Sequence, residues 1–367
     1  MRSLKFKFKK TLNNEVKIVI GKSATKGINV CFRNLNPDRV FVVSDSNVAA
    51  RYGREVIKAI DKRYSAHLIT HIPDESGKNL RNLEKIINEF FSAGGTYRSC
   101  ICSLGGGVTG NIAGLAASII DRGISLVHIP TTLLAQLDSA PDVKHSINVP
   151  GIKNAVGSYK CPDFVLIDPL FLESLSLREI KSGIAEAIKH GFSQDLQFVK
   201  FISSSNKKNK LTNLNTLERI VCKTISLKIR HWEQTPTKWN EKKKTERLTH
   251  IGHTIGKVLE MLDIDYLTHG EAISHGMVIE TYISYLLGYL KKDSANYVNS
   301  ILKDLNLLYP LNDFYSSKEI LNYLYPKNSR EKPVFALLKK LGNPETISTT
   351  ISRAVIKKAL TWYFKQA

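Results

Sequence analysis

Ser99-Cys-Ile-Cys-Ser-Leu104 runs directly into Gly105-Gly-Gly-Val-Thr-Gly110, and the small, helix-forming residues 111–120 follow. A strand, a glycine turn and a helix in this order are typical of a parallel α/β sheet that binds phosphate at a helix N-terminus. Glycines at 105, 107 and 110 have the spacing that lets backbone N–H groups approach a pyrophosphate. A simple tight turn would also need glycine. The turn follows the fourth predicted strand and not the first, so it differs from an ordinary first-turn dinucleotide fingerprint.

Alternating strand and helix patterns surround this turn. Strands are expected at residues 16–20, 39–44, 66–70, 124–130 and 164–168, and helices at 49–62 and 80–93. Strand, helix, strand is the pattern of a parallel sheet. From residue 170 onward the pattern is helix after helix. We therefore expect an α/β N-terminal domain with a parallel sheet and Rossmann-like cofactor binding at residues 1–175, and an all-α C-terminal domain at 176–367.

Composition narrows the class of protein. The chain has 367 residues, 43% hydrophobic and 23% charged, which suits a globular protein with two cores. Its apolar runs are far shorter than the roughly 18 residues of a membrane span. Residues 1–10 are basic, lead into no apolar signal segment and predict an edge strand, so we expect a cytoplasmic protein with its five cysteines reduced.

The net charge of +20 leaves two interpretations open. Basic residues could bind nucleic acid, but they are spread along the chain without an aromatic-interleaved pattern. A solvated surface together with an anionic substrate accounts for the same charge.

Polar residues gather in two further places. Asp45, Asn47, Glu75 and Lys78 lie at the ends of early elements, where they could bind ribose hydroxyls or could be ordinary turn residues. Residues 131–154 carry many polar side chains in what we expect to be a loop, either exposed surface or, as we favour, a ligand-binding wall.

Three separate fragments offer metal ligands. Glu186 lies in the helical segment Ser182–Gly191, His253 lies in Gly252-His-Thr-Ile-Gly256, and His269 precedes Gly270. Each fragment alone suits a surface carboxylate, a helix cap or a packed ring. One carboxylate and two imidazoles together suit a catalytic zinc or similar divalent ion with one position open.

These motifs resemble those of the sugar phosphate cyclase superfamily, the 3-dehydroquinate synthases and the 2-deoxy-scyllo-inosose synthases. The resemblance extends from about Asp45 to Gly342. It is carried by Gly105–Gly114, Arg122-Gly123, Pro130–Ala135, Lys153-Asn154, Gly183–Gly191, Gly252–Gly256 and His269–Met277.

The resemblance implies a dehydroquinate synthase-like fold, usually a homodimer, that binds NAD and one divalent metal ion, Zn or Co. It implies that bound NAD⁺ oxidises a hydroxyl, phosphate is eliminated, the hydride returns, and an aldol addition closes a carbocycle. The implied metal ligands are Glu186, His253 and His269. The implied cofactor-binding residues are Asp45, Asn47, Glu75, Lys78, Gly105, Gly106, Gly107, Thr131, Thr132, Asp138 and Lys153. The implied substrate-binding residues are Asn111, Asn154, Lys228 and Lys332, and the implied catalytic residues are Lys144 and Lys189. We also predict catalytic roles for His250 and Lys257, which stand at motif positions where the family has other residues.

Departures from the family pattern favour one branch. Asn111 stands where dehydroquinate synthases have Asp, and the segment Asp138–Lys144 lacks their glycines. Glu246 stands where dehydroquinate synthases have an Arg, which would bind a substrate carboxylate, and Arg247 follows it directly. These features are similar to 2-deoxy-scyllo-inosose synthases and predict glucose 6-phosphate as the substrate.

His250 and Lys257 match neither branch. The alternatives are a 3-dehydroquinate synthase, a metal-dependent polyol dehydrogenase, and a non-catalytic or nucleic-acid-binding protein. The expected partner is therefore a small phosphorylated sugar, with no nucleic acid and no membrane.

Overall fold

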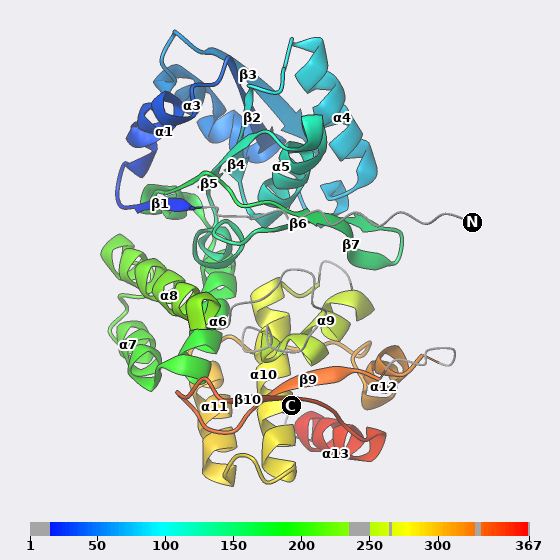
Figure 1. The fold of residues 1–367 in the computed structure, drawn as a ribbon. Helices are drawn as coiled ribbons and strands as arrows, with labels where there is room; N and C mark the ends of the chain where they lie inside the picture. Colours follow the sequence, from blue (N-terminus) through cyan, green and yellow to red (C-terminus); the bar gives the residue numbers. More distant parts are fainter. Residues whose placement is uncertain (1–14, 235–249, 264–265, 327–331, 366–367) are drawn as a thin grey trace, which may run out of the picture. The chain divides into compact units, whose positions relative to one another are not determined.

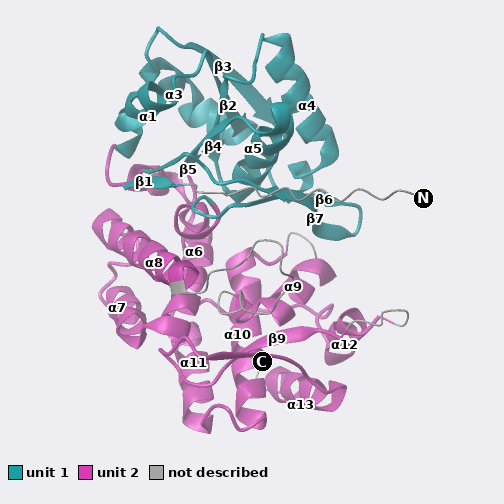
Figure 2. Ribbon diagram, in the orientation of Figure 1, with its two compact units in different colours: residues 1–19, 24–130, 140–167 teal, residues 20–23, 131–139, 168–367 magenta. Residues whose placement is uncertain are grey.

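The computed structural model describes the whole chain except residues 1–14, 235–249, 264–265, 327–331 and 366–367 (Figure 1). The chain forms two compact units, coloured separately in Figure 2. Unit 1 comprises residues 1–19, 24–130 and 140–167, and unit 2 comprises residues 20–23, 131–139 and 168–367. The expected domain boundary at residue 175 stays a prediction. The edge strand predicted at residues 1–10 lies outside the described residues.

Unit 1 is built on a six-stranded sheet in the order β1-β8-β5-β4-β2-β3. The β2–β3, β2–β4, β4–β5 and β5–β8 pairs are all parallel, as the strand–helix alternation predicts. Its strands are β1 (Lys17–Ile20), β2 (Arg39–Asp45), β3 (Ser65–His71), β4 (Cys100–Gly105), β5 (Ser125–Pro130) and β8 (Phe164–Ile167).

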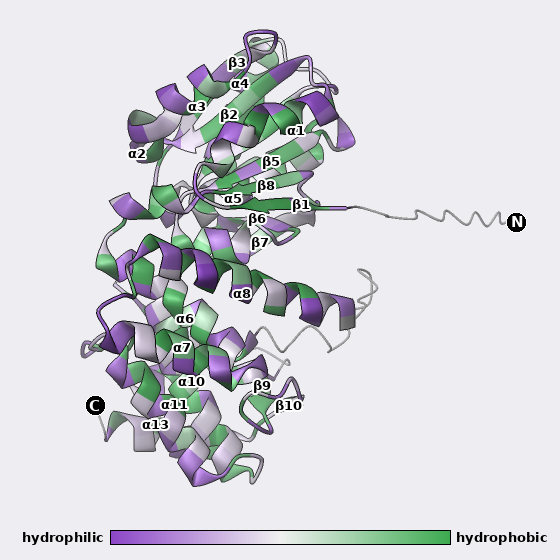
Figure 3. Cartoon of the chain, turned by 90° about the vertical axis from the view of Figure 1, so that its left-hand side faces the viewer, coloured by the Kyte–Doolittle hydropathy of each residue, from purple (hydrophilic) through white to green (hydrophobic). Residues whose placement is uncertain are grey.

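Apolar strands, the amphipathic helix α4 and the mainly apolar helix α5 form the core of unit 1. Phe41, Ile101 and Leu126 of the sheet are fully buried, and they belong to one cluster with Phe90 of α4 and Ile112 of α5. Figure 3 shows the sheet strands mainly in the hydrophobic colour, as expected for strands covered on both faces. The helices are α1 (Ile28–Leu35), α2 (Ser46–Val48), α3 (Arg54–Ala59), α4 (Leu80–Ser92) and α5 (Gly107–Ile119). The helix expected at 49–62 begins with a π-helical turn, Ala49–Gly53, and continues as α3 only to Ala59.

The segment expected to be a loop contains a hairpin. Strands β6 (Lys144–Val149) and β7 (Ile152–Tyr159) pair antiparallel as a separate two-stranded sheet. The expectation of a loop was wrong for these residues: polar side chains that suggested a loop, such as Asn148 of β6 and Asn154 of β7, lie on the two strands of the hairpin, and β7 is largely exposed.

Unit 2 is helical, as expected, with one addition. Its helices are α6 (Leu177–Gln194), α7 (Leu196–Lys207), α8 (Leu214–Gln234), α9 (His253–Leu262), α10 (His269–Leu286), α11 (Lys292–Asp304), α12 (Ser317–Leu324) and α13 (Arg353–Phe364). The addition is an antiparallel ribbon of β9 (Val334–Leu338) and β10 (Thr346–Thr350), so the unit is not purely α.

Helix α10 lies at the centre of unit 2. It packs against α6, α9, α11 and α13, and its residues are buried around most of its circumference. Since α6, α9 and α10 each carry one of the predicted metal ligands, this packing decides whether the three side chains meet. In the described residues, no helix is both long and apolar enough to cross a membrane.

Candidate metal centre and cofactor cradle

Helix α6 places Glu186 at full burial. The helix begins after Ser176, whose hydroxyl accepts a hydrogen bond from the Glu179 backbone, and it is buried from Ser182 to Ser193. Glu186 lies in the middle of this stretch with no exposed surface. A buried carboxylate is costly unless cations or hydrogen-bond donors surround it.

Helix α9 begins at His253, directly after a glycine in the left-handed conformation. Gly252 has φ +79°, and a Cβ there would lie 2.7 Å from the Ile273 carbonyl oxygen. The buried carboxylate of Glu280 accepts hydrogen bonds from the backbone N–H groups of Gly252 and Ile255, at 2.8 and 2.9 Å. These contacts fix the first turn of α9, and with it the backbone that carries His253.

Helix α10 begins at His269 behind a capping box made by Thr268 and Glu271. The Gly270 N–H donates to Ser182 Oγ at 3.0 Å, and a Cβ on Gly270 would come within 2.2 Å of the Ser182 carbonyl oxygen. This close approach of α10 to α6 brings His269 beside Glu186.

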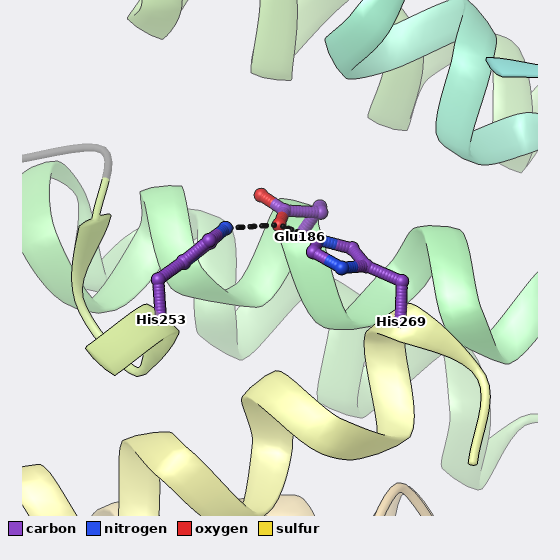
Figure 4. Close-up of side chains that lie close together, drawn as sticks. All are labelled: Glu186, His253 and His269. Atoms are coloured by element: carbon purple, nitrogen blue, oxygen red, sulfur yellow. Dashed lines mark hydrogen bonds and ion pairs between the residues drawn. The ribbon is translucent and has the colours of Figure 1, made fainter. Parts of the chain in front are cut away.

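The three predicted ligands converge in unit 2 (Figure 4). Glu186 Oε1 lies 3.1 Å from His269 Nε2 and 3.4 Å from His253 Nε2. One ligand atom from each of the three residues lies within 4.8 Å of the others. One carboxylate oxygen and two imidazole nitrogens fit a zinc-like ion that keeps a position for substrate. We call these residues the Glu–His–His cluster.

The electrostatics of this cluster favour a bound cation. Burial raises the pKa of Glu186, but Lys189 and the two histidines outweigh it and hold that pKa well below its ordinary value. Burial lowers the pKa of His269, yet Glu260 and Glu186 together raise it to about 10. The pKa of His253 is lowered, by burial and by Lys189. The carboxylates therefore stabilise positive charge at the His269 position.

Two buried lysines accompany the cluster. Lys189 Nζ forms an ion pair with Glu186 Oε2, and Lys228 Nζ lies 2.8 Å from Asp138 Oδ1. Burial raises the pKa of Asp138, but Lys228 more than offsets it and lowers that pKa to about 2. Asp138, Glu186 and His190 form a second group of metal-ligand type among the described residues. Lys228 pairs with Asp138, whereas Lys189 pairs with Oε2 of Glu186 and Oε1 faces the two histidines, so the Glu–His–His cluster is the better cation site.

Unit 1 contains the glycine turn. Gly105 ends β4, Gly106 is the N-cap of α5, and Gly107 is its first residue. A Cβ on Gly105 would lie 2.5 Å from the Thr109 hydroxyl oxygen, so this position needs glycine. Asp45 caps α2 by accepting from the backbone N–H groups of Asn47 and Val48, and Asn47 itself is exposed.

A polar network joins other predicted residues of unit 1. The buried Lys78 amine donates to Asn154 Oδ1, and Asn148 Nδ2 donates to Glu75 Oε1 at 2.8 Å. Asn111 Oδ1 accepts from the Ser146 N–H at 2.9 Å. Predicted cofactor residues and predicted substrate residues thus meet around the β6–β7 hairpin.

The remaining predicted residues lie apart from these groups or are peripheral to them. Lys144 is exposed and Lys153 half-buried on the hairpin; Thr131 is buried and Thr132 half-buried in unit 2. The His250 ring centroid is 5.7 Å from that of His253. Lys257 and Lys332 are exposed, and Glu246 and Arg247 lie outside the described residues. The functional roles of all these residues stay predictions.

Sequence reasoning missed two carboxylates. Glu260 contacts His269 Nδ1 at 3.2 Å, and Glu280 binds the first turn of α9. Glu260 follows His253 by two helical turns, a spacing that puts both residues on one face and could have identified it. Glu280 is an acidic residue within the apolar stretch of α10, and this unusual position could have identified it as a buried, hydrogen-bonded carboxyl group.

These observations define a protein class: a parallel α/β unit with a glycine turn, joined in one chain to a helical unit that carries a candidate divalent-metal centre. Family models identify it further. The 3-dehydroquinate synthase N-terminal model matches residues 68–182, and the C-terminal model matches residues 183–329. The chain therefore belongs to the 3-dehydroquinate synthase family of sugar phosphate cyclases.

Individual relatives fall into two branches. The chain is 34% identical to a 3-dehydroquinate synthase of Clostridium beijerinckii, over 95% of this chain and 96% of the relative. It is 30% identical to a 2-deoxy-scyllo-inosose synthase of Micromonospora echinospora, over 84% and 79%. A solved 2-deoxy-scyllo-inosose synthase, complexed with carbaglucose-6-phosphate, NAD⁺ and Co²⁺, superposes with TM-score 0.84 at 26% identity, over 94% of this chain and 95% of that one. The family is thus established, and both branches match.

Proposed function

We propose that this enzyme is a 2-deoxy-scyllo-inosose synthase-like cyclase that acts on glucose 6-phosphate with NAD and one divalent metal ion. The observation that carries the proposal is the Glu–His–His cluster, formed by the buried Glu186 and two half-buried histidines, with the buried Lys189 and Lys228 in the same unit. The solved relative that holds NAD⁺, Co²⁺ and a glucose 6-phosphate analogue supports the same set of ligands. Homodimerisation and a cytoplasmic location belong to this proposal as well.

The residues of unit 2 suit the binding and polarisation of an anionic sugar. When bound at Glu186, His253 and His269, a divalent ion supplies Lewis acidity toward a substrate hydroxyl, and NAD supplies reversible oxidation. Lys189 and Lys228 are buried cations, and such amines bind phosphate through charge-assisted hydrogen bonds. Each amine forms an ion pair with a carboxylate, Lys189 with Glu186 and Lys228 with Asp138.

In unit 1, the glycine turn supports the cofactor assignment. The backbone at Gly105–Gly107 opens α5, and a helix N-terminus of this kind favours a pyrophosphate. Asn111 lies in the first turns of α5 and stands where dehydroquinate synthases have Asp. This replacement and the non-glycine segment before Lys144 are similar to 2-deoxy-scyllo-inosose synthases, and the similarity supports glucose 6-phosphate over the seven-carbon keto acid phosphate of the shikimate route.

The test is inorganic phosphate release, measured in parallel on these two substrates with NAD⁺ and Co²⁺ or Zn²⁺ present. We expect release from glucose 6-phosphate, a carbocyclic ketone product by mass spectrometry, and no accumulation of NADH. The variants Glu186→Ala and His253→Ala should release no phosphate above background and should retain no stoichiometric metal. Full metal content in both variants would refute the ligand assignment.

Other outcomes identify the alternatives. Release only from the keto acid phosphate would make the enzyme a 3-dehydroquinate synthase. NADH that accumulates in step with substrate consumption would instead indicate the metal-dependent polyol dehydrogenase.

A further inference from the structure

His269 uses both of its ring nitrogens. Its Nε2 lies 3.1 Å from Glu186 Oε1, inside the Glu–His–His cluster, and its Nδ1 lies 3.2 Å from Glu260 Oε1. A neutral imidazole has one nitrogen that donates a hydrogen bond and one that offers a lone pair, and the tautomer decides which is which. In the neutral ring that a metal ion requires, a carboxylate on Nδ1 therefore keeps the proton there and leaves the Nε2 lone pair pointing at the cluster.

Glu260 is placed for this contact by the same helix that supplies His253. Helix α9 starts at His253, and Glu260 follows two turns later on the same face. Its side chain is only 13% exposed, so water competes little for its oxygens. Helix α9 thus supplies one ligand of the cluster, His253. It also supplies Glu260, whose carboxylate contacts Nδ1 of a second ligand, His269.

The two histidines have different partners behind them. The Nδ1 of His253 lies 3.2 Å from the backbone carbonyl oxygen of Ile251, a neutral acceptor. The Nδ1 of His269 faces an anionic acceptor, and hydrogen bonds to charged groups are roughly twice as strong as neutral ones. His269 should accordingly be the more firmly oriented and more basic ligand of the pair.

We propose that Glu260 is a positioning residue for the metal site: it accepts the Nδ1–H of His269, fixes the ring orientation and increases the electron donation of Nε2 to the ion. The proposal rests on the ligand assignment in the proposed function. It does not depend on which sugar phosphate is the substrate.

The experiment measures Co²⁺ binding to the full chain by titration and by the visible absorption spectrum of the bound ion. The variants are Glu260→Ala, which removes the acceptor, and Glu260→Gln, which keeps a neutral acceptor of the same shape. Glu173→Gln, an exposed carboxamide substitution in the same unit, is the matched control. Circular dichroism establishes that each variant is folded before titration.

We expect Co²⁺ affinity to fall by roughly 10- to 100-fold in Glu260→Ala, and by less in Glu260→Gln. The absorption bands of the bound ion should shift in Glu260→Ala, and Glu173→Gln should match the wild type in both measurements. A purely structural carboxylate would change the free energy of unfolding but would leave affinity and spectrum of the folded protein unchanged.

Wild-type affinity and an unshifted spectrum in both Glu260 variants would overturn the proposal. Absence of Co²⁺ binding by the wild type would overturn it together with the ligand assignment. If the wild type binds Co²⁺ but releases no phosphate from either substrate, the proposed reaction fails, while a loss of affinity in Glu260→Ala would still support the role of Glu260.

Discussion

At the scale of single residues, the Lys228–Asp138 pair carries the clearest energetic consequence. Lys228 is almost fully buried, and its amine lies 2.8 Å from Asp138 Oδ1. The same amine makes a cation–π contact with Trp232, 5.1 Å from the ring centroid. Both charged residues were predicted as ligand-binding groups, one for substrate and one for cofactor. Each therefore has a structural partner in addition to its predicted ligand.

Substitution of one member of this pair should lower the free energy of unfolding more than substitution of both. We expect Lys228→Met to lower the free energy of unfolding by about 2 kcal/mol, because the half-buried carboxylate of Asp138 loses the cation that offsets its desolvation. Asp138→Asn combined with Lys228→Met should recover at least half of that loss. Urea unfolding of the wild type, both single variants and the double variant gives the coupling free energy. A loss in the double variant equal to the sum of the two single losses would contradict a coupled pair.

At the scale of elements, two glycines on α5 offer a matched comparison. A Cβ on Gly114 would lie 2.3 Å from the His145 ring, whose Nε2 is held by the Lys160 carbonyl oxygen, whereas a Cβ on Gly110 would meet its nearest neighbour, His128, at 3.9 Å. Gly114 therefore permits the close packing of α5 on β6, and Gly110 has room for a methyl group.

Gly114→Ala should destabilise unit 1 by roughly 1–3 kcal/mol through overpacking. Gly110→Ala should be neutral or stabilising by up to about 1 kcal/mol, because alanine is the better helix former. Denaturant unfolding followed by circular dichroism measures both. If the two substitutions have the same effect, the packing of α5 against His145 does not limit stability.

The same elements show how far the sequence alone leads. The buried strands β2, β4, β5 and β8 are continuous apolar runs, so their positions could be predicted. The β6–β7 hairpin could not, because its exposed strand β7 has small and polar residues without a buried face to set a period of two. The motif containing His253 was recognisable from its spacing, but Glu260 acquires its role only when α10 packs on α9.

At the scale of the whole molecule, buried neutral histidines in both units link stability to pH. Burial lowers the pKa of His145 in unit 1 and of His275 in unit 2 to about 4 each. The rings bond to the backbone carbonyls of Lys160 and Tyr309, which only partly offsets burial. In the unfolded chain these rings titrate near ~6.5. Burial raises the pKa of Glu280 to about 8, so its contribution has the opposite sign, present at low pH and lost as pH rises.

Each buried histidine therefore stabilises the fold above its unfolded pKa, and this stability is lost as the pH falls through about 6.5 toward 4, because only the unfolded chain then takes up the proton. We expect the difference in unfolding free energy between the wild type and His275→Asn to shrink by about 3 kcal/mol between about pH 7 and pH 4. His145→Asn should behave alike in unit 1. The subtraction removes Glu280 and every other group that titrates in both proteins, so urea unfolding at several pH values isolates each ring. A difference that stays constant across this range would mean that the folded protein protonates the histidine as readily as the unfolded chain does, and that burial does not keep the ring neutral.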